Sequence, residues 1–343
     1  MRRAALAAMV MIVGCASQPR AAPGAHKVMT DLAHVVDPQL RAALVSMPEI
    51  EVTLAAVRQD RQQLDDFLAT MPRSERASNR TIPGSSGSPP VRVRIYRPAT
   101  AEATLPALVW LHGGGWTLGR PEMDETFLQR LADDVPLVVI SVDYRLAPEH
   151  PYPAPLDDAE ATLDWTTAAA AELGLDPAQI FVGGTSSGAN LAAGLAVRRR
   201  DRGSGPAVAF QLLLYPVLDD RLATPSMHGI ADRRTITREF MRHRWNAYLG
   251  NGDVAADASP ARATDLARLP PAALLVAELD PLRDEAVAYA TRLWSSGVGC
   301  DLHVFRGGIH GFDVIAPASS LSKLATDFVI SSLRRARRSG RGS

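Results

Sequence analysis

The chain has 343 residues, of which 46% are hydrophobic and 22% are charged, and its formal net charge is zero. A hydrophobic fraction of this size suffices for a large buried core, in one large domain or two modest ones. A net charge of zero gives no global electrostatic reason to expect nucleic acid or an acidic surface as a partner.

The N-terminus predicts an export signal with a lipid anchor. Residues 1–3 form a short positive region, and residues 4–13 are apolar but too short to span a bilayer as a mature helix. Cys15 follows in a pattern that resembles a bacterial lipobox, so we expect a lipoprotein-type signal peptide at 1–15 and lipidation of Cys15. Residues 16–28 would be a tether, and the protein an exported, membrane-anchored lipoprotein at the periplasmic face or cell surface. The alternative is an ordinary signal peptide with a chance cysteine.

The next segment is expected to be helical. Between Met29 and Met71 apolar side chains recur at helical spacing with charges between them, which predicts a helical segment over residues 29–80. Residues 81–90 are rich in Pro, Gly and Ser and indicate a linker or turn. Residues 91–96 alternate between apolar and polar, which is typical of a half-exposed strand at a sheet edge.

After residue 91, short apolar runs alternate with helical stretches. The runs with the length of strands are residues 107–111, 137–142, 180–182, 208–214 and 272–277. Buried strands that alternate with helices predict an α/β fold with a mainly parallel central sheet and helices on both faces. We assign residues 81–343 to one catalytic domain of this kind.

One segment interrupts the alternation. Residues 219–250 carry aromatic and apolar side chains at helical spacing, with Arg and His between them, and predict a helical insertion after a strand. Together with residues 29–80, this insertion would form a helical cap over the C-terminal edge of the sheet. The alternative is that both segments are simply helices of the outer layer.

A serine lies between two glycines at a predicted strand-to-helix turn, Gly184–Gly188. A serine on such an elbow takes a strained backbone conformation, and glycine is needed two residues away on either side because larger side chains would collide. The spacing selects Ser186 as the nucleophile rather than Ser187. The backbone N–H of Ser187 is a candidate for an oxyanion hole, because it opens the following helix.

A glycine-rich loop follows the predicted strand at 107–111. Gly113, Gly114 and Gly115 let the backbone approach a substrate with unshielded N–H groups, so they are candidate oxyanion-hole donors, with Gly114 and Gly115 preferred. A merely flexible turn is the alternative. We interpret His112, at the start of this loop, as a structural residue rather than a base.

The base and its orienting acid should follow the serine in the order acid, then histidine. His310 lies in a loop directly after a strand-like run, whereas His303 lies inside that run. We therefore predict His310 as the base. Asp280 follows the apolar run at 272–277, at the C-terminal end of that predicted strand, and is the predicted acid, which would hold the imidazole in one tautomer and stabilise its cation. Asp284 is expected to open the next helix instead.

With these residues placed, the chain resembles the hormone-sensitive-lipase-like family of bacterial esterases, within the α/β-hydrolase fold. The motifs that carry the resemblance fall in the family's order: His112–Trp116, Val142–His150, Pro151–Asp158, Gly184–Gly188, Asp280–Asp284 and His310–Phe312. The resemblance implies Ser186, Asp280 and His310 as a triad. It also implies an oxyanion hole from the N–H groups of Gly114, Gly115 and Ser187, and a cap from the two helical segments. Ser187 departs from the alanine that is common at its position.

These motifs predict a serine-dependent carboxylic-ester hydrolase that works through an acyl-enzyme. The resemblance implies short- to medium-chain acyl esters as substrates. A deacetylase, lactonase or amidase would use the same triad and remains an alternative, as does a binding module that has kept a hydrolase fold. The sequence predicts no cofactor, and it lacks the His-Glu-x-x-His pattern of a common metal site. The expected partner is a small-molecule ester, besides a membrane reached through Cys15.

Overall fold

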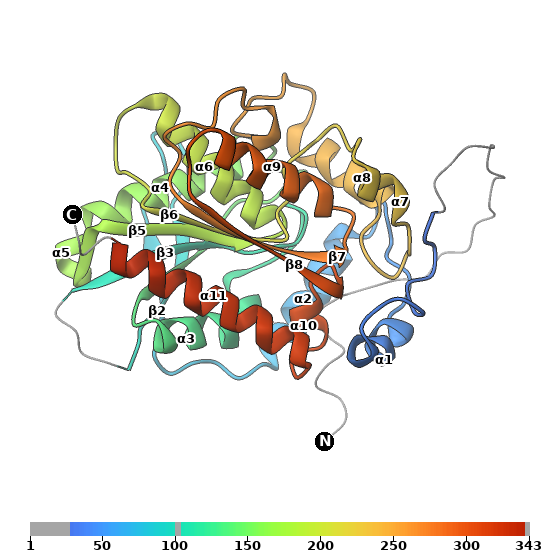
Figure 1. The fold of residues 1–343 in the computed structure, drawn as a ribbon. Helices are drawn as coiled ribbons and strands as arrows, with labels where there is room; N and C mark the ends of the chain where they lie inside the picture. Colours follow the sequence, from blue (N-terminus) through green and yellow to red (C-terminus); the bar gives the residue numbers. More distant parts are fainter. Residues whose placement is uncertain (1–27, 100–103, 340–343) are drawn as a thin grey trace.

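The computed structural model describes residues 28–99 and 104–339. Within them the chain forms an eight-stranded sheet in the order β1-β2-β4-β3-β5-β6-β7-β8 (Figure 1). The strands are β1 (Ala77–Ile82), β2 (Val91–Tyr96), β3 (Leu105–Leu111), β4 (Val138–Asp143), β5 (Leu175–Thr185), β6 (Phe210–Leu214), β7 (Ala272–Leu279) and β8 (Cys300–Ile309). From β4 to β8 all neighbours are parallel, while β2 pairs antiparallel with both β1 and β4. The predicted α/β fold with a mainly parallel sheet is confirmed.

Helices cover both faces of this sheet. Figure 1 shows α4, α6 and α9 on one side and α3 and α11 on the other. The described helices are α1 (Pro38–Ser46), α2 (Val57–Ala69), α3 (Glu125–Asp134), α4 (Ala154–Ala168), α5 (Ala170–Leu173), α6 (Ser187–Arg202), α7 (Pro225–Gly229), α8 (Arg238–Leu249), α9 (Arg283–Ser295), α10 (Phe312–Ile315) and α11 (Ser320–Ser339), with short 3-10 turns at Pro121–Asp124 and Pro260–Arg262. In the part of the chain that is described, no helix is both long and apolar enough to cross a membrane.

The core follows from this layering. Every side chain of β3 and of β6 is buried, because helices cover both faces of the sheet. A strand buried on both faces needs a continuous apolar run rather than an alternating one. That requirement explains why the central strands were recognisable from the sequence.

The edge of the sheet differs from the prediction. Strand β1 was not expected, and it pairs with β2, so the prediction that residues 91–96 form the edge strand is wrong. The alternating polar residues of β2 are arginines that make ion pairs instead of facing water. Arg94 is only 6% exposed and contacts the Glu125 carboxylate at 2.6 Å, while Arg92 contacts Glu122 at 2.6 Å and Asp143 at 2.8 Å.

The N-terminal segment (residues 28–76) and the insertion (residues 219–250) meet at one end of the sheet. Met29 forms a parallel bridge with Ile230, and the Ile50 N–H donates to the Arg233 carbonyl at 2.7 Å. In Figure 1, α1, α7 and α8 lie at the right-hand end of the molecule, and α2 lies nearer its centre. Two segments far apart in the sequence therefore form one layer.

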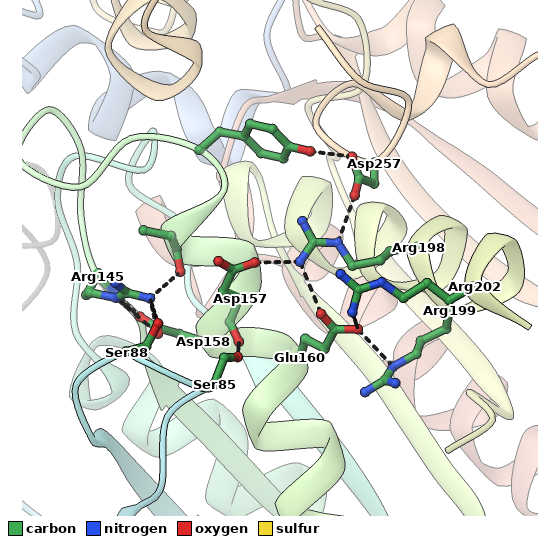
Figure 2. A network of polar contacts seen from close by, with 12 residues as sticks. Ser85, Ser88, Arg145, Asp157, Asp158, Glu160, Arg198, Arg199, Arg202 and Asp257 are labelled. Atoms are coloured by element: carbon green, nitrogen blue, oxygen red, sulfur yellow. Dashed lines mark hydrogen bonds and ion pairs between the residues drawn. The ribbon is translucent and has the colours of Figure 1, made fainter. Parts of the chain in front are cut away.

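A network of ion pairs fixes helix α4 and the loop before it (Figure 2). Arg198 of α6 donates to Asp157 and to Asp257, each at 2.7 Å. The side chain of Arg145, in the loop after β4, donates to both carboxylate oxygens of the almost fully buried Asp158. The stretch after β4 also contacts the glycine-rich loop, because the Ala147 N–H donates to the Trp116 carbonyl at 2.9 Å.

Candidate active site

Strand β5 ends at Thr185 and helix α6 begins at Ser187, so Ser186 occupies the turn between them. Its backbone has φ 53° and ψ −118°, in a region that is strained for a residue with a side chain. A Cβ on Gly184 would lie 2.3 Å from the Leu111 carbonyl oxygen, and one on Gly188 would lie 1.9 Å from the same atom. Glycine is therefore required at both positions, for the steric reason that the sequence suggested.

The three residues predicted as a triad lie together. The Ser186 Oγ is 3.1 Å from His310 Nε2, and His310 Nδ1 is 2.8 Å from an oxygen of Asp280. Asp280 is fully buried, and its other carboxylate oxygen accepts a hydrogen bond from the Leu282 N–H at 2.9 Å. With both oxygens engaged, the carboxylate holds the imidazole so that Nδ1 carries the proton and Nε2 faces the serine.

The candidate oxyanion donors lie beside Ser186. Gly113, Gly114 and Gly115 line the same cavity as the serine, and Ser187 is the first residue of α6. Within the described residues, the N–H groups of Gly114, Gly115 and Ser187 donate to no protein acceptor. Gly114 has φ +116°, and a Cβ there would lie 2.0 Å from the Leu118 carbonyl oxygen, so the loop cannot take this shape without glycine. Unpaired donors at a helix start and a glycine loop favour a negative charge nearby.

His112 supports this loop and does not take part in the relay. It is fully buried, and its Nδ1–H donates to the Gly113 carbonyl at 2.8 Å. Its ring stacks on Tyr144 with centroids 4.2 Å apart, and the Tyr144 hydroxyl donates to the His112 carbonyl at 2.7 Å. Burial lowers the pKa of His112 to about 4, so the imidazole is neutral at physiological pH. The interpretation of His112 as structural agrees with these contacts.

A cavity of about 240 Å³ leads to the serine. Its floor contains Ser186, His310 and the glycine-rich loop, and its roof comes from the two cap segments. The N-terminal segment contributes mainly apolar side chains such as Leu64 and Phe67, and helix α8 contributes Phe240, Met241 and Arg244. Both segments that were expected to form a cap therefore line the cavity that contains Ser186.

Two partly buried acidic side chains, Asp124 and Asp313, lie in the neighbourhood of His310. Burial raises the pKa of the Asp124 carboxyl to about 6, although the Trp110 indole donates to it at 2.7 Å. Burial also raises the pKa of Asp313 and of Tyr215. The Tyr215 ring contacts the His310 ring edge-on, with the ring centroids 4.9 Å apart. His310 thus works in a region that is largely closed to water, where electrostatic interactions are stronger than in bulk solvent.

Two further points concern the predicted site residues. Cys15, the predicted lipidation site, lies outside the described residues. Among the residues that are described, no three His, Cys, Asp or Glu side chains are arranged to hold a metal ion.

Sequence reasoning did not identify Arg244 as a residue of the cavity. Helical spacing places it one turn after Phe240, and that spacing was the available signal.

The chain is similar to known proteins over most of its length. A family profile described as the α/β-hydrolase fold matches residues 108–314. The carboxylesterase NlhH of Mycobacterium tuberculosis is 37% identical over 310 residues, which cover 88% of this chain and 96% of that protein.

Solved structures are similar over nearly the whole length. A bacterial heroin esterase superposes with a TM-score of 0.83 and 38% identity, covering 89% of this chain and 99% of the other. The esterase LipW from Mycobacterium marinum superposes with a TM-score of 0.81 and 36% identity, covering 89% of this chain and 96% of LipW. The likeness therefore includes the cap segments as well as the sheet.

Proposed function

This chain belongs to the hormone-sensitive-lipase-like carboxylesterases of the α/β-hydrolase fold, and from that membership we propose that Ser186, His310 and Asp280 form its catalytic triad. The observation that carries the proposal is the continuous relay from the Ser186 Oγ through both nitrogens of His310 to Asp280. A serine, an imidazole and a buried carboxylate in hydrogen-bond contact are the parts that nucleophilic acyl transfer requires.

The proposed reaction proceeds in two halves. His310 Nε2 takes the proton of Ser186 as its Oγ attacks the ester carbonyl, and the N–H groups of Gly114, Gly115 and Ser187 stabilise the resulting oxyanion. His310 then gives the proton to the departing alcohol. Water, deprotonated by the same imidazole, attacks the acyl-enzyme, and the acid leaves as Ser186 regains its proton. Asp280 stays ionised and stabilises the imidazolium in both halves.

We propose short- to medium-chain acyl esters as the substrates. The cavity volume of about 240 Å³ supports this, since pockets that enclose larger ligands occupy about 300–1,000 Å³. Deacetylase, lactonase or amidase activity with the same residues is the alternative. An ester is favoured over these because the similar proteins named above are esterases.

The test compares hydrolysis of p-nitrophenyl butyrate and p-nitrophenyl palmitate by the wild type, Ser186→Ala and Ser187→Ala. We expect faster turnover of the butyrate, and a loss of about a thousandfold or more in kcat for Ser186→Ala. Ser187→Ala is the matched control, since it removes the adjacent hydroxyl and keeps the backbone N–H. Equal rates for the wild type and Ser186→Ala would contradict the triad, and a preference for palmitate would contradict the chain length.

For localisation we propose lipidation at Cys15, on the lipobox-like pattern at the end of the apolar N-terminal stretch. Replacing Cys15 by Ser removes the thiol that would carry the lipid, so the protein should leave the membrane fraction. The measurement is fractionation with a blot, using Cys300→Ser as the control that keeps the anchor. Membrane-bound Cys15→Ser protein, together with unprocessed wild type, would exclude the anchor.

A further inference from the structure

Arg244 is a buried cation in the roof of the cavity. It lies on α8, is only 6% exposed and lines the cavity together with Thr117 and Phe240. Its Nη1 donates to the Thr117 hydroxyl at 2.9 Å, and its guanidinium lies 4.6 Å from the centre of the Phe240 ring. The buried Nε has no hydrogen-bond partner within the described residues. An arginine offers five N–H donors, so most of its capacity is unused.

The other deeply buried arginines behave differently. Arg94 and Arg198, each also 6% exposed, contact carboxylate oxygens at 2.6 and 2.7 Å, and Figure 2 shows the partners of Arg198. For Arg244, no carboxylate of the described residues comes within 4.0 Å. Buried charges are normally paired, because the loss of hydration is otherwise not compensated. Arg244 is thus a buried guanidinium that faces a cavity without its own carboxylate.

The charge is retained at neutral pH. Burial lowers the pKa of Arg244 to about 10, which leaves the guanidinium protonated below that pH. Asp60 and Glu51 also line the cavity, beyond direct contact, and their charges partly offset this effect. Asp60 is partly buried, and this burial raises the pKa of its carboxyl.

We propose that Arg244 binds a carboxylate of the substrate, so that the preferred ester carries a free carboxylate in its acyl or its alcohol part. The inference rests on the proposed function, because it concerns the same cavity and the same reaction. A guanidinium is suited to this role, since its planar fork of donors matches a carboxylate in a bidentate contact. The aliphatic part of the Arg244 side chain packs closely against the glycine-rich loop, since a Cβ on Gly115 would lie only 3.0 Å from the Arg244 Cγ.

The experiment measures kcat/KM for matched pairs of esters. In the acyl arm, p-nitrophenyl hydrogen glutarate is compared with its neutral monoamide. In the alcohol arm, γ-acetoxybutyrate is compared with γ-acetoxybutyramide. We expect the charged member to be preferred in one arm by about ten- to a hundredfold, the range for a charge-assisted hydrogen-bonded contact. The arm that shows the preference identifies which part of the substrate carries the carboxylate.

Three variants test whether Arg244 causes the preference for the charged ester. Arg244→Gln should abolish the preference, because kcat/KM for the charged ester should fall by about ten- to a hundredfold more than kcat/KM for the neutral ester. Asp60→Asn should enlarge it, since a competing negative charge is removed. Arg242→Gln, the same change at an exposed position of the same helix, should leave both rates unchanged. If Arg244→Gln does not fold, competitive inhibition of wild-type butyrate hydrolysis by glutarate, and not by glutaramide, supplies the same information.

Two results would overturn the inference. One is equal or slower hydrolysis of the charged member in both arms, with no inhibition by glutarate. The other is an equal loss on charged and neutral esters in Arg244→Gln, which would make Arg244 a positioning residue for Thr117 and the glycine-rich loop. Either result leaves the triad intact if Ser186→Ala remains inactive on the neutral esters, so failure of this inference is distinguishable from failure of the proposed function.

Discussion

The side chain of Tyr144 contacts His112 twice, through ring stacking at 4.2 Å and through a hydrogen bond from its hydroxyl to the His112 carbonyl at 2.7 Å. The carbonyl is the one that immediately precedes the three glycines of the candidate oxyanion loop. A tyrosine from the loop after β4 therefore fixes the start of a loop that follows β3.

Tyr144→Phe should destabilise the protein by about 1–3 kcal/mol, because it leaves a buried carbonyl without its donor. We also expect a several-fold lower kcat with little change in KM, since a loosened loop holds the oxyanion less well. Chemical denaturation and steady-state kinetics measure the two effects. Tyr289→Phe is the control, since the buried Tyr289 hydroxyl has no hydrogen-bond partner in the described part of the chain. Equal stability of Tyr144→Phe and the wild type would contradict this account.

The acid sensitivity of the fold should depend on His112. Its pKa is lowered to about 4 in the folded protein, against 6.5 for an ordinary histidine, so the unfolded chain binds the proton more readily. Stability is therefore lost as the pH falls from about 6.5 towards about 4, by about 2 kcal/mol at pH 5. His112→Gln should be less stable at pH 8 and should lack this part of the decline. Urea unfolding of both proteins at pH 8 and pH 5 tests the prediction, which fails if the two decline in parallel.

The buried pair of Arg94 and Glu125 should matter far more than an exposed pair. Arg94→Met leaves the Glu125 carboxylate buried beside an apolar side chain, and we expect a loss of about 3–5 kcal/mol. Arg130→Met is the matched control, because Arg130 pairs with Asp134 on the exposed side of α3, where such pairs contribute about 0.3–0.5 kcal/mol. Denaturation midpoints compare the two. Similar losses for both variants would show that the buried pair has no special role.

Replacement of Ser186 and replacement of Ser187 by Ala should have very different effects on activity. The buried Ser187 hydroxyl lies near that of Tyr144 but makes no well-formed hydrogen bond with any described residue. Ser187→Ala should therefore keep stability within about 1 kcal/mol, because only an unpaired hydroxyl is lost. Its kcat should change no more than a few-fold. Covalent labelling by a fluorophosphonate should persist in Ser187→Ala and disappear in Ser186→Ala, and labelling of Ser186→Ala would assign the nucleophile elsewhere.

The sequence predicted the central sheet and the contact between Ser186, Asp280 and His310 because both follow from local rules. Strands buried on two faces must be apolar throughout, and the elbow, the glycine loop and the strand ends all meet at one edge of a parallel sheet. Residues far apart in the chain could thus be placed together without knowledge of any contact between them.

Strand β1 and the pairing of Arg94 could not be predicted in this way. β1 reads Ala-Ser-Asn-Arg-Thr-Ile, and most of it is exposed, so neither periodicity nor hydropathy marks it as a strand. The alternating arginines of β2 led to the prediction of a half-exposed strand, because the carboxylates that pair with them come from other segments of the chain. Arg244 was missed for a different reason, since its proposed partner is a substrate carboxylate and no residue of the sequence could indicate it.

The joining of Met29 to Ile230 and of Ile50 to Arg233 has a consequence for biosynthesis. The roof of the cavity includes Ile50, which is synthesised before all the described strands, whereas His310 in its floor is synthesised after all of them. Domains form during synthesis from the N-terminus onward, yet this roof has no surface to cover until the final strand has been added. A chain that stops before Ile230 therefore carries its N-terminal segment without these packing partners, and the cavity is complete only once His310 has been synthesised.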